Sequence, residues 1–120
     1  MMILTKIIIG FVAFVHVHIM GLEIFVWTTK APKVFKSISK DLFKSTKTLA
    51  ANQGLYNGFI AAGLIGSLLL NNTEWFQNIS LFFLSCVAIA RIYGALTISK
   101  RILYVQTIPS LLGIVSVLSN

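Results

Sequence analysis

Residues 7–27 have the sequence IIIGFVAFVHVHIMGLEIFVW, in which Glu23 is the one charged side chain at neutral pH. A helix that crosses a bilayer needs about 20 consecutive and mostly apolar residues. This stretch reaches that length and ends at Trp27, an aromatic side chain of the kind found at membrane interfaces. It therefore predicts a membrane-spanning helix over residues 5–27.

Three further apolar segments follow at residues 46–70, 74–98 and 102–119. Each is close to the spanning length of a helix and too long for a strand of a membrane barrel. We therefore predict an all-α fold, a polytopic membrane protein whose single transmembrane domain over residues 1–120 is a four-transmembrane-helix bundle.

The composition of the chain also indicates a membrane protein. The chain has 120 residues, of which 57% are hydrophobic and 11% are charged, and its mean hydropathy is +0.88. A soluble domain has about 45–50% apolar and about 25% charged residues. The composition therefore argues against a soluble domain and against a disordered chain.

Most charged residues lie on one side of the predicted bundle, and the net charge is +7. The loop over residues 28–47 holds six lysines and the third connection holds two more basic residues, which together are Lys30, Lys33, Lys36, Lys40, Lys44, Lys47, Lys100 and Arg101. Basic loops stay in the cytoplasm, so we predict an N-out/C-out topology, in the bacterial cytoplasmic membrane. Lysines beside apolar spans indicate binding to anionic lipid of the bilayer rather than to nucleic acid.

The basic loop also carries apolar residues at near-helical spacing, namely Val34, Phe35, Ile38, Leu42 and Phe43. That pattern fits a short amphipathic segment lying on the inner leaflet. It fits equally a segment whose apolar side chains cover the end of the bundle. The sequence leaves both interpretations open.

The most informative residues are polar side chains inside the predicted spans. A charged side chain at the centre of a spanning helix costs about 2.5–3.5 kcal/mol, so such groups normally face a partner or a wet cavity. Six of them, mostly in the half of the spans nearest the basic loops, are His16, Glu23, Gln53, Asn57, Arg91 and Gln106. We predict that they line a polar pocket open to the cytoplasm, with Glu23 and Arg91 as an ion pair. The alternative is that they only hold the helices together by hydrogen bonds.

The second predicted helix carries a row of small residues, Gly54, Gly58, Ala62 and Gly66. Such rows let two helices approach closely. The row serves either packing within the chain or a homo-oligomer, and we expect an oligomer.

The sequence contains no motif of soluble catalytic machinery. It has no GxSxG, no P-loop, no HExxH and no paired cysteines. His16 and His18 lie on opposite faces of a straight helix, so they cannot bind one metal ion together. We therefore expect no catalytic residue, no metal and no cofactor.

Four segments resemble a known family. They are residues 22–27 (LEIFVW), 46–58 (TKTLAANQGLYNG), 92–95 (IYGA) and 101–106 (RILYVQ). They are similar to the domain-of-unknown-function family numbered 1304, and the resemblance covers nearly the whole chain. It implies a four-span membrane protein of bacteria and fungi, and it implies no activity.

The leading functional hypothesis is a small transporter or channel subunit whose polar pocket binds a solute or an ion. In size, number of spans and a single Glu in the first helix, the chain is similar to small multidrug-resistance transporters, although their helix-one motif is missing. The second hypothesis is an accessory or assembly membrane protein that binds a partner or anionic lipid through its Lys-rich loop. The third hypothesis is a membrane enzyme.

Overall fold

The computed structural model describes residues 1–97, 100–101 and 103–120. Every element in that part of the chain is helical, which confirms the all-α prediction. The elements are α1 (Met2–Phe25), α2 (Ala31–Val34), α3 (Leu42–Ser45), α4 (Lys47–Leu68), α5 (Thr73–Thr97), the π-helix η1 (Leu103–Thr107) and α6 (Ile108–Leu118).

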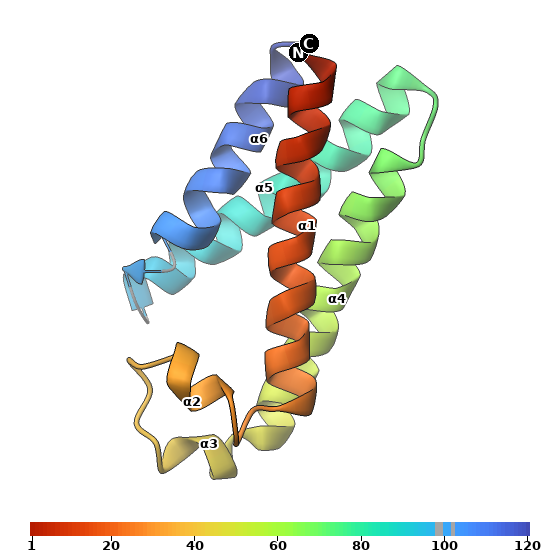
Figure 1. The fold of residues 1–120 in the computed structure, drawn as a ribbon. Helices are drawn as coiled ribbons and strands as arrows, with labels where there is room; N and C mark the ends of the chain where they lie inside the picture. The colour runs from red at the N-terminus through yellow and green to blue at the C-terminus, as the bar shows by residue number, and fades with distance from the viewer. Residues whose placement is uncertain (98–99, 102) are drawn as a thin grey trace.

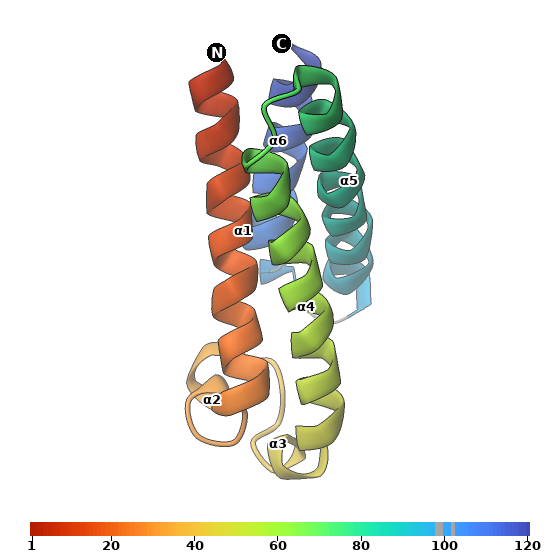
Figure 2. The same cartoon turned by 90° about the vertical axis from the view of Figure 1, so that its right-hand side faces the viewer.

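The four longer helices pack against one another in a ring, in the order α1, α4, α5 and α6, with α6 returning to α1. Figures 1 and 2 show both chain ends at one end of an elongated molecule and the short helices α2 and α3 at the other. The molecule measures 47 × 24 × 18 Å along its principal axes. The basic segment between α1 and α4 therefore lies at the end of the molecule opposite to the chain ends.

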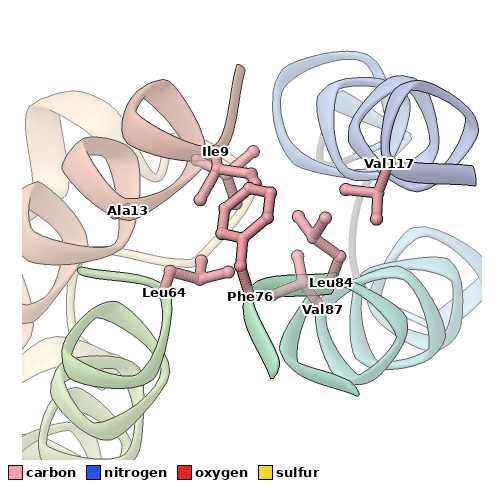
Figure 3. Close-up of a cluster of buried hydrophobic side chains, with 8 residues drawn as sticks. Ile9, Ala13, Leu64, Phe76, Leu84, Val87 and Val117 are labelled. Carbon is pink, nitrogen blue, oxygen red and sulfur yellow. The ribbon is translucent and has the colours of Figure 1, made fainter. Parts of the chain in front are cut away.

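The main core joins all four helices. Figure 3 shows the Phe76 ring of α5 between Ile9 of α1 and Leu64 of α4. Ala13 of α1 and Val87 of α5 belong to the same buried cluster. Leu84 of α5 and Val117 of α6 complete the contact across the ring. These side chains are at most 2% exposed, so their burial holds the helices together through the hydrophobic effect or, in lipid, through packing alone.

Two of the four predicted spans meet the requirements of a membrane-crossing helix by length and composition, namely α1 and α5. Helix α4 has 22 residues, but its first half carries Lys47, Asn52, Gln53 and Asn57, which lower its mean hydropathy. Helix α6 is apolar but has only 11 residues. The prediction of four spans is therefore met in part.

The fourth predicted helix is interrupted. The expected single helix over residues 102–119 is the π-helix η1 followed by α6. Pro109, near the start of α6, has no backbone N–H, and its ring crowds the carbonyl four residues earlier, at Val105 within η1. The wider turn of a π-helix accommodates such a disruption. The predicted boundaries at residues 98 and 102 lie outside the described residues.

The segment between α1 and α4 folds back onto the ends of these helices. The Trp27 ring lies 4.8 Å from the Phe43 ring and 5.6 Å from the Phe35 ring, between centroids. The Trp27 indole also donates a hydrogen bond to the Thr46 hydroxyl at 3.0 Å. Phe43 is buried and Phe35 is half-buried, whereas Val34 is exposed. The apolar residues of the loop therefore mainly cover the end of the helices, which is the second of the two interpretations.

Candidate functional site

Three polar side chains from three helices form one hydrogen-bonded chain inside the molecule. The Asn57 amide nitrogen of α4 donates to Glu23 Oε1 of α1 at 2.5 Å. The Asn57 amide oxygen accepts a hydrogen bond from the Arg91 guanidinium of α5, also at 2.5 Å. Asn57 is 3% exposed and Glu23 is 9% exposed. We call Glu23, Asn57 and Arg91 the charged relay.

The relay corrects the predicted direct ion pair between Glu23 and Arg91. The two charged groups are joined through Asn57, and no direct ion pair between them is present in the described part of the chain. An amide side chain has both donor and acceptor groups, so Asn57 can serve a carboxylate on one side and a guanidinium on the other. Arg91 still interacts electrostatically with Glu23.

Two glycines beside the relay explain how α4 comes so close to α1. A Cβ atom added at Gly54 would lie 2.7 Å from Ile24 Cγ1 and 3.0 Å from Glu23 Cβ. A Cβ atom at Gly58 would lie 2.7 Å from the Met20 sulfur. Only glycine leaves room for these contacts. The first half of the predicted small-residue row thus packs within the chain.

The second half of that row, Ala62 and Gly66, does not pack closely within the chain. Ala62 and Gly66 are exposed, and a Cβ atom at Gly66 would meet nothing within 4 Å. Ala62 and Gly66 therefore do not pack closely against another helix of this chain, and their packing in a homo-oligomer stays a prediction. Between them, a Cβ atom at Gly63 would meet the Phe83 ring of α5.

His16 and Gln106 are both buried, as predicted, but they are not part of the relay. His16 Nδ1 lies 2.8 Å from the Val12 carbonyl oxygen of the preceding helical turn. His16 and Gln106 line the same narrow internal space between α1 and η1. Arg91 interacts electrostatically with His16. The polar interior therefore extends from the relay toward η1.

Several polar atoms in this region have no hydrogen-bond partner. Among the described residues, the buried atoms without one are His16 Nε2, Arg91 Nε, Gln106 Oε1 and Thr107 Oγ1. A buried polar group without a partner is costly and rare in folded proteins. The four atoms come from α1, α5 and η1, so the polar interior is the least satisfied part of the structure.

Gln53 is the predicted pocket residue that the structure places elsewhere, because its side chain is exposed. The inward face of α4 is formed by Ala50, Gly54, Asn57, Ala61 and Leu64. Helical periodicity puts Gln53 and Asn57 about 40° apart. The close contact at Gly54 turns Asn57 inward and leaves Gln53 outside.

The main cavity lies beside the relay and has a different chemistry from the predicted pocket. Its volume is about 240 Å³, and α1, the segment before α3, and η1 form its walls. Of the six predicted pocket residues, Gln106 lines it, and neither Glu23 nor Arg91 does. The remaining lining residues are Phe14, Val15, His18, Ile19, Leu22, Val34, Phe35, Lys36, Ser37, Ile38, Arg101 and Val105. This cavity is therefore mostly apolar with basic residues, and a polar pocket at Glu23 and Arg91 stays a prediction.

Sequence reasoning missed this cavity because its walls come from apolar residues of distant segments. The available signal was the apolar spacing in the basic loop, which brings Phe35 and Ile38 toward α1. His18, on the face of α1 away from His16, was the other signal.

A second polar group, at the other end of α1, contains no charged side chain. Thr5 Oγ1 of α1 lies 2.5 Å from Ser116 Oγ of α6. The Asn120 amide nitrogen donates to Thr5 Oγ1 at 2.6 Å and to the Ser116 carbonyl oxygen at 2.7 Å. We call Thr5, Ser116 and Asn120 the hydroxyl cluster. It joins the first turn of α1 to the last turn of α6.

The chain belongs to the family described as Protein of unknown function (DUF1304), whose model matches residues 10–118. It is also similar to the Uncharacterized protein YpaA of Lactococcus lactis subsp. lactis (strain IL1403). The two are 34% identical over 118 residues, which cover 97% of this chain and 98% of that protein. These findings confirm the family resemblance of the four sequence segments. No solved structure gives a significant match to the chain.

Proposed function

We propose that the chain is an integral membrane protein whose four longer helices cross the bilayer. The fourth span consists of η1 and α6 together. The low burial of the two helices that are long and apolar enough to cross a membrane, α1 and α5, supports this. Only 39% of the apolar window of α1 and 22% of that of α5 is buried inside the molecule. Large side chains such as Phe14, Phe82 and Leu96 are 64–83% exposed. Exposed apolar area of this extent marks a surface that meets lipid or a partner.

The distribution of charge supports an N-out/C-out orientation in a cytoplasmic membrane. All six lysines of residues 28–47 are exposed, and they lie at the end away from the chain ends. Basic loops of this kind stay on the cytoplasmic side.

Single cysteines test the orientation. In a Cys86→Ser background, Lys40→Cys should react with a membrane-impermeant maleimide only after the cells are opened. Asn72→Cys, between α4 and α5, should react in intact cells. The reverse pattern contradicts the orientation, and reaction of both sites in intact cells contradicts the membrane-spanning fold.

Within this fold, we propose that the protein is a small transporter or channel subunit. The observation that carries this proposal is the charged relay together with the unpartnered polar atoms beside it. Charged side chains within a membrane span are costly and commonly lie on ion or solute pathways. The relay is nearly closed to solvent in this structure, so passage requires α1 or α5 to move relative to α4.

Flux across liposomes tests the transport function. The purified protein is reconstituted with a pH-sensitive dye inside the vesicles and challenged with a panel of cationic, anionic and neutral solutes. We expect proton-coupled flux for one solute class, with loss of at least 90% of the flux in Glu23→Gln, an order-of-magnitude loss typical of a group that acts directly on the transported charge.

Glu74→Gln is the matched control, because Glu74 is an exposed carboxylate at the start of α5. It should transport as the unaltered protein does. Silent vesicles across the whole panel, or equal flux in Glu23→Gln and the control, contradict the transport function.

The exposed lysines favour a second candidate, an accessory or assembly protein that docks on anionic lipid or on a partner. Each lysine near an anionic membrane surface contributes about 1 kcal/mol of attraction. Purification from mild detergent, with and without the six lysines changed to glutamine, tests this function. A stoichiometric partner that is lost from the altered protein supports it. Recovery of a homo-oligomer without other proteins in both cases contradicts the partner role.

A further inference from the structure

The cavity between α1, the basic segment and η1 lies outside the relay and combines two kinds of surface. Its walls are mainly aliphatic and aromatic, with Phe14, Ile19 and Leu22 from α1 facing Phe35 and Ile38 from the basic segment. We propose that this cavity binds a fatty acyl chain that carries an anionic headgroup, taken from the surrounding lipid.

The size of the cavity suits part of a chain rather than a whole lipid. Its volume of about 240 Å³ lies just below the roughly 300–1,000 Å³ of sites that enclose drug-sized ligands. The cavity is also open to the outside along one side, since Phe14 and Val105 line it and are themselves exposed. An acyl chain can therefore enter from the lipid without crossing the molecule.

The polar residues of the cavity indicate the charge of the headgroup. Lys36 is an exposed lining residue of the cavity, and its side chain is cationic. No carboxylate is among the lining residues that the structure describes. A cationic lining residue without a carboxylate beside it favours an anion. Ser37 and His18 lie on the same cavity and offer further hydrogen-bonding groups.

Only an amphiphile uses both surfaces. A small soluble anion makes no use of the apolar walls, and a neutral lipid offers no counter-charge to Lys36. Lys36 belongs to the basic segment, so in the proposed orientation the headgroup lies at the cytoplasmic leaflet. The inference rests on the proposed membrane fold but not on transport, because neither Glu23 nor Arg91 lines the cavity.

Native mass spectrometry of the detergent-solubilised chain tests the ligand class. The probes are a long-chain fatty acid, its methyl ester and inorganic phosphate. We expect one fatty acid to bind saturably per chain. The methyl ester should bind about fivefold more weakly, because it lacks the charge that faces Lys36. Inorganic phosphate should not displace the fatty acid. Equal binding of acid and ester, or displacement by phosphate, overturns the proposal.

Two pairs of variants test the location. Lys36→Gln removes the cation that faces the headgroup and should weaken fatty-acid binding about fivefold. Lys40→Gln removes an exposed lysine of the same segment that does not line the cavity and should leave binding unchanged. Ser37→Phe fills the cavity from an exposed position and should weaken binding about tenfold, by displacing an apolar chain segment. Lys40→Phe is its control.

Equal effects of the two lysine variants would show that binding follows the net surface charge, and they overturn the proposal. The lysine pair also decides the question if Ser37→Phe does not fold, because Lys36 and Lys40 are both exposed. The measurement is made in detergent and involves no flux. Silent liposomes with intact fatty-acid binding therefore contradict only the transport function, and lost binding with intact flux contradicts only this inference.

Discussion

The charged relay and the hydroxyl cluster occupy opposite ends of α1, and both join helices through buried polar groups. The hydroxyl cluster links α1 to α6 by short hydrogen bonds between neutral groups, and Thr5 is fully buried within it. The relay links α1, α4 and α5 through a carboxylate and a guanidinium. The unpartnered buried atoms lie on the relay's side of the molecule and on none of the three residues of the hydroxyl cluster.

The two regions differ in the free-energy cost of their buried polar groups. Neutral hydrogen bonds suffice to hold helices together, at about 0.6 kcal/mol each on average in a membrane protein. Two charges and several unsatisfied atoms are a costly way to achieve the same end. The relay is therefore the costlier way to join helices, as we expect if it serves the proposed transport function, and the hydroxyl cluster is the less costly one.

Loss of the bridging amide should have the largest effect on stability. Asn57→Leu keeps a similar volume but leaves both charged partners without their hydrogen bonds. Two hydrogen bonds to charged groups at about 1.5 kcal/mol each predict a loss of about 3 kcal/mol in the free energy of unfolding. Unfolding in mixed micelles of increasing SDS content, followed by circular dichroism, measures it. Asn52→Leu, at an exposed position of the same helix, is the control and should change little.

The close contact beside the relay should be the next most sensitive. Gly54→Ala places a methyl group against Ile24 and Glu23, and overpacking of this kind costs about 2 kcal/mol. Gly66→Ala meets open space and should be neutral or raise stability by about 0.5–1 kcal/mol, through better helix propensity. The same unfolding assay compares them. Equal losses in the two variants contradict the close approach of α1 and α4.

A double-mutant cycle tests whether Asn57 transmits the interaction between the two charges. Glu23→Gln and Arg91→Gln, singly and together, should show a coupling energy of about 1 kcal/mol. In an Asn57→Leu background this coupling should fall below about 0.5 kcal/mol, the usual limit of additivity. Coupling that persists without Asn57 argues for a direct ion pair and against the relay.

The hydroxyl cluster should be the least sensitive region. Thr5→Val keeps the shape of the side chain and removes its hydrogen bonds to Ser116 and Asn120. At about 0.6 kcal/mol for each bond, we expect a loss of about 1 kcal/mol. Thr48→Val, at an exposed position of α4, is the control. A loss in Thr5→Val as large as that in Asn57→Leu removes the distinction between the two regions.

The sequence predicted the helical fold and most of the polar interior, because both depend on local properties. The length and hydropathy of residues 7–27 determine a helix wherever that segment packs. Polar groups are costly in apolar helices, and this cost is enough to identify Glu23, Asn57 and Arg91 from the sequence. Of the six predicted pocket residues, four are buried and Arg91 is half-buried, whereas Gln53 is exposed.

What the sequence alone could not determine is how the helices are rotated and what lies between them. Gln53 and Asn57 differ by a small angle, and only the contact of Gly54 with α1 selects Asn57 as the inward residue. That choice turns a predicted ion pair into a bridged relay. The cavity likewise needs the basic segment to fold back over Trp27. A helix is fixed by interactions within a few residues, but its rotation and its cavities depend on side chains from distant segments, which meet only in the tertiary structure.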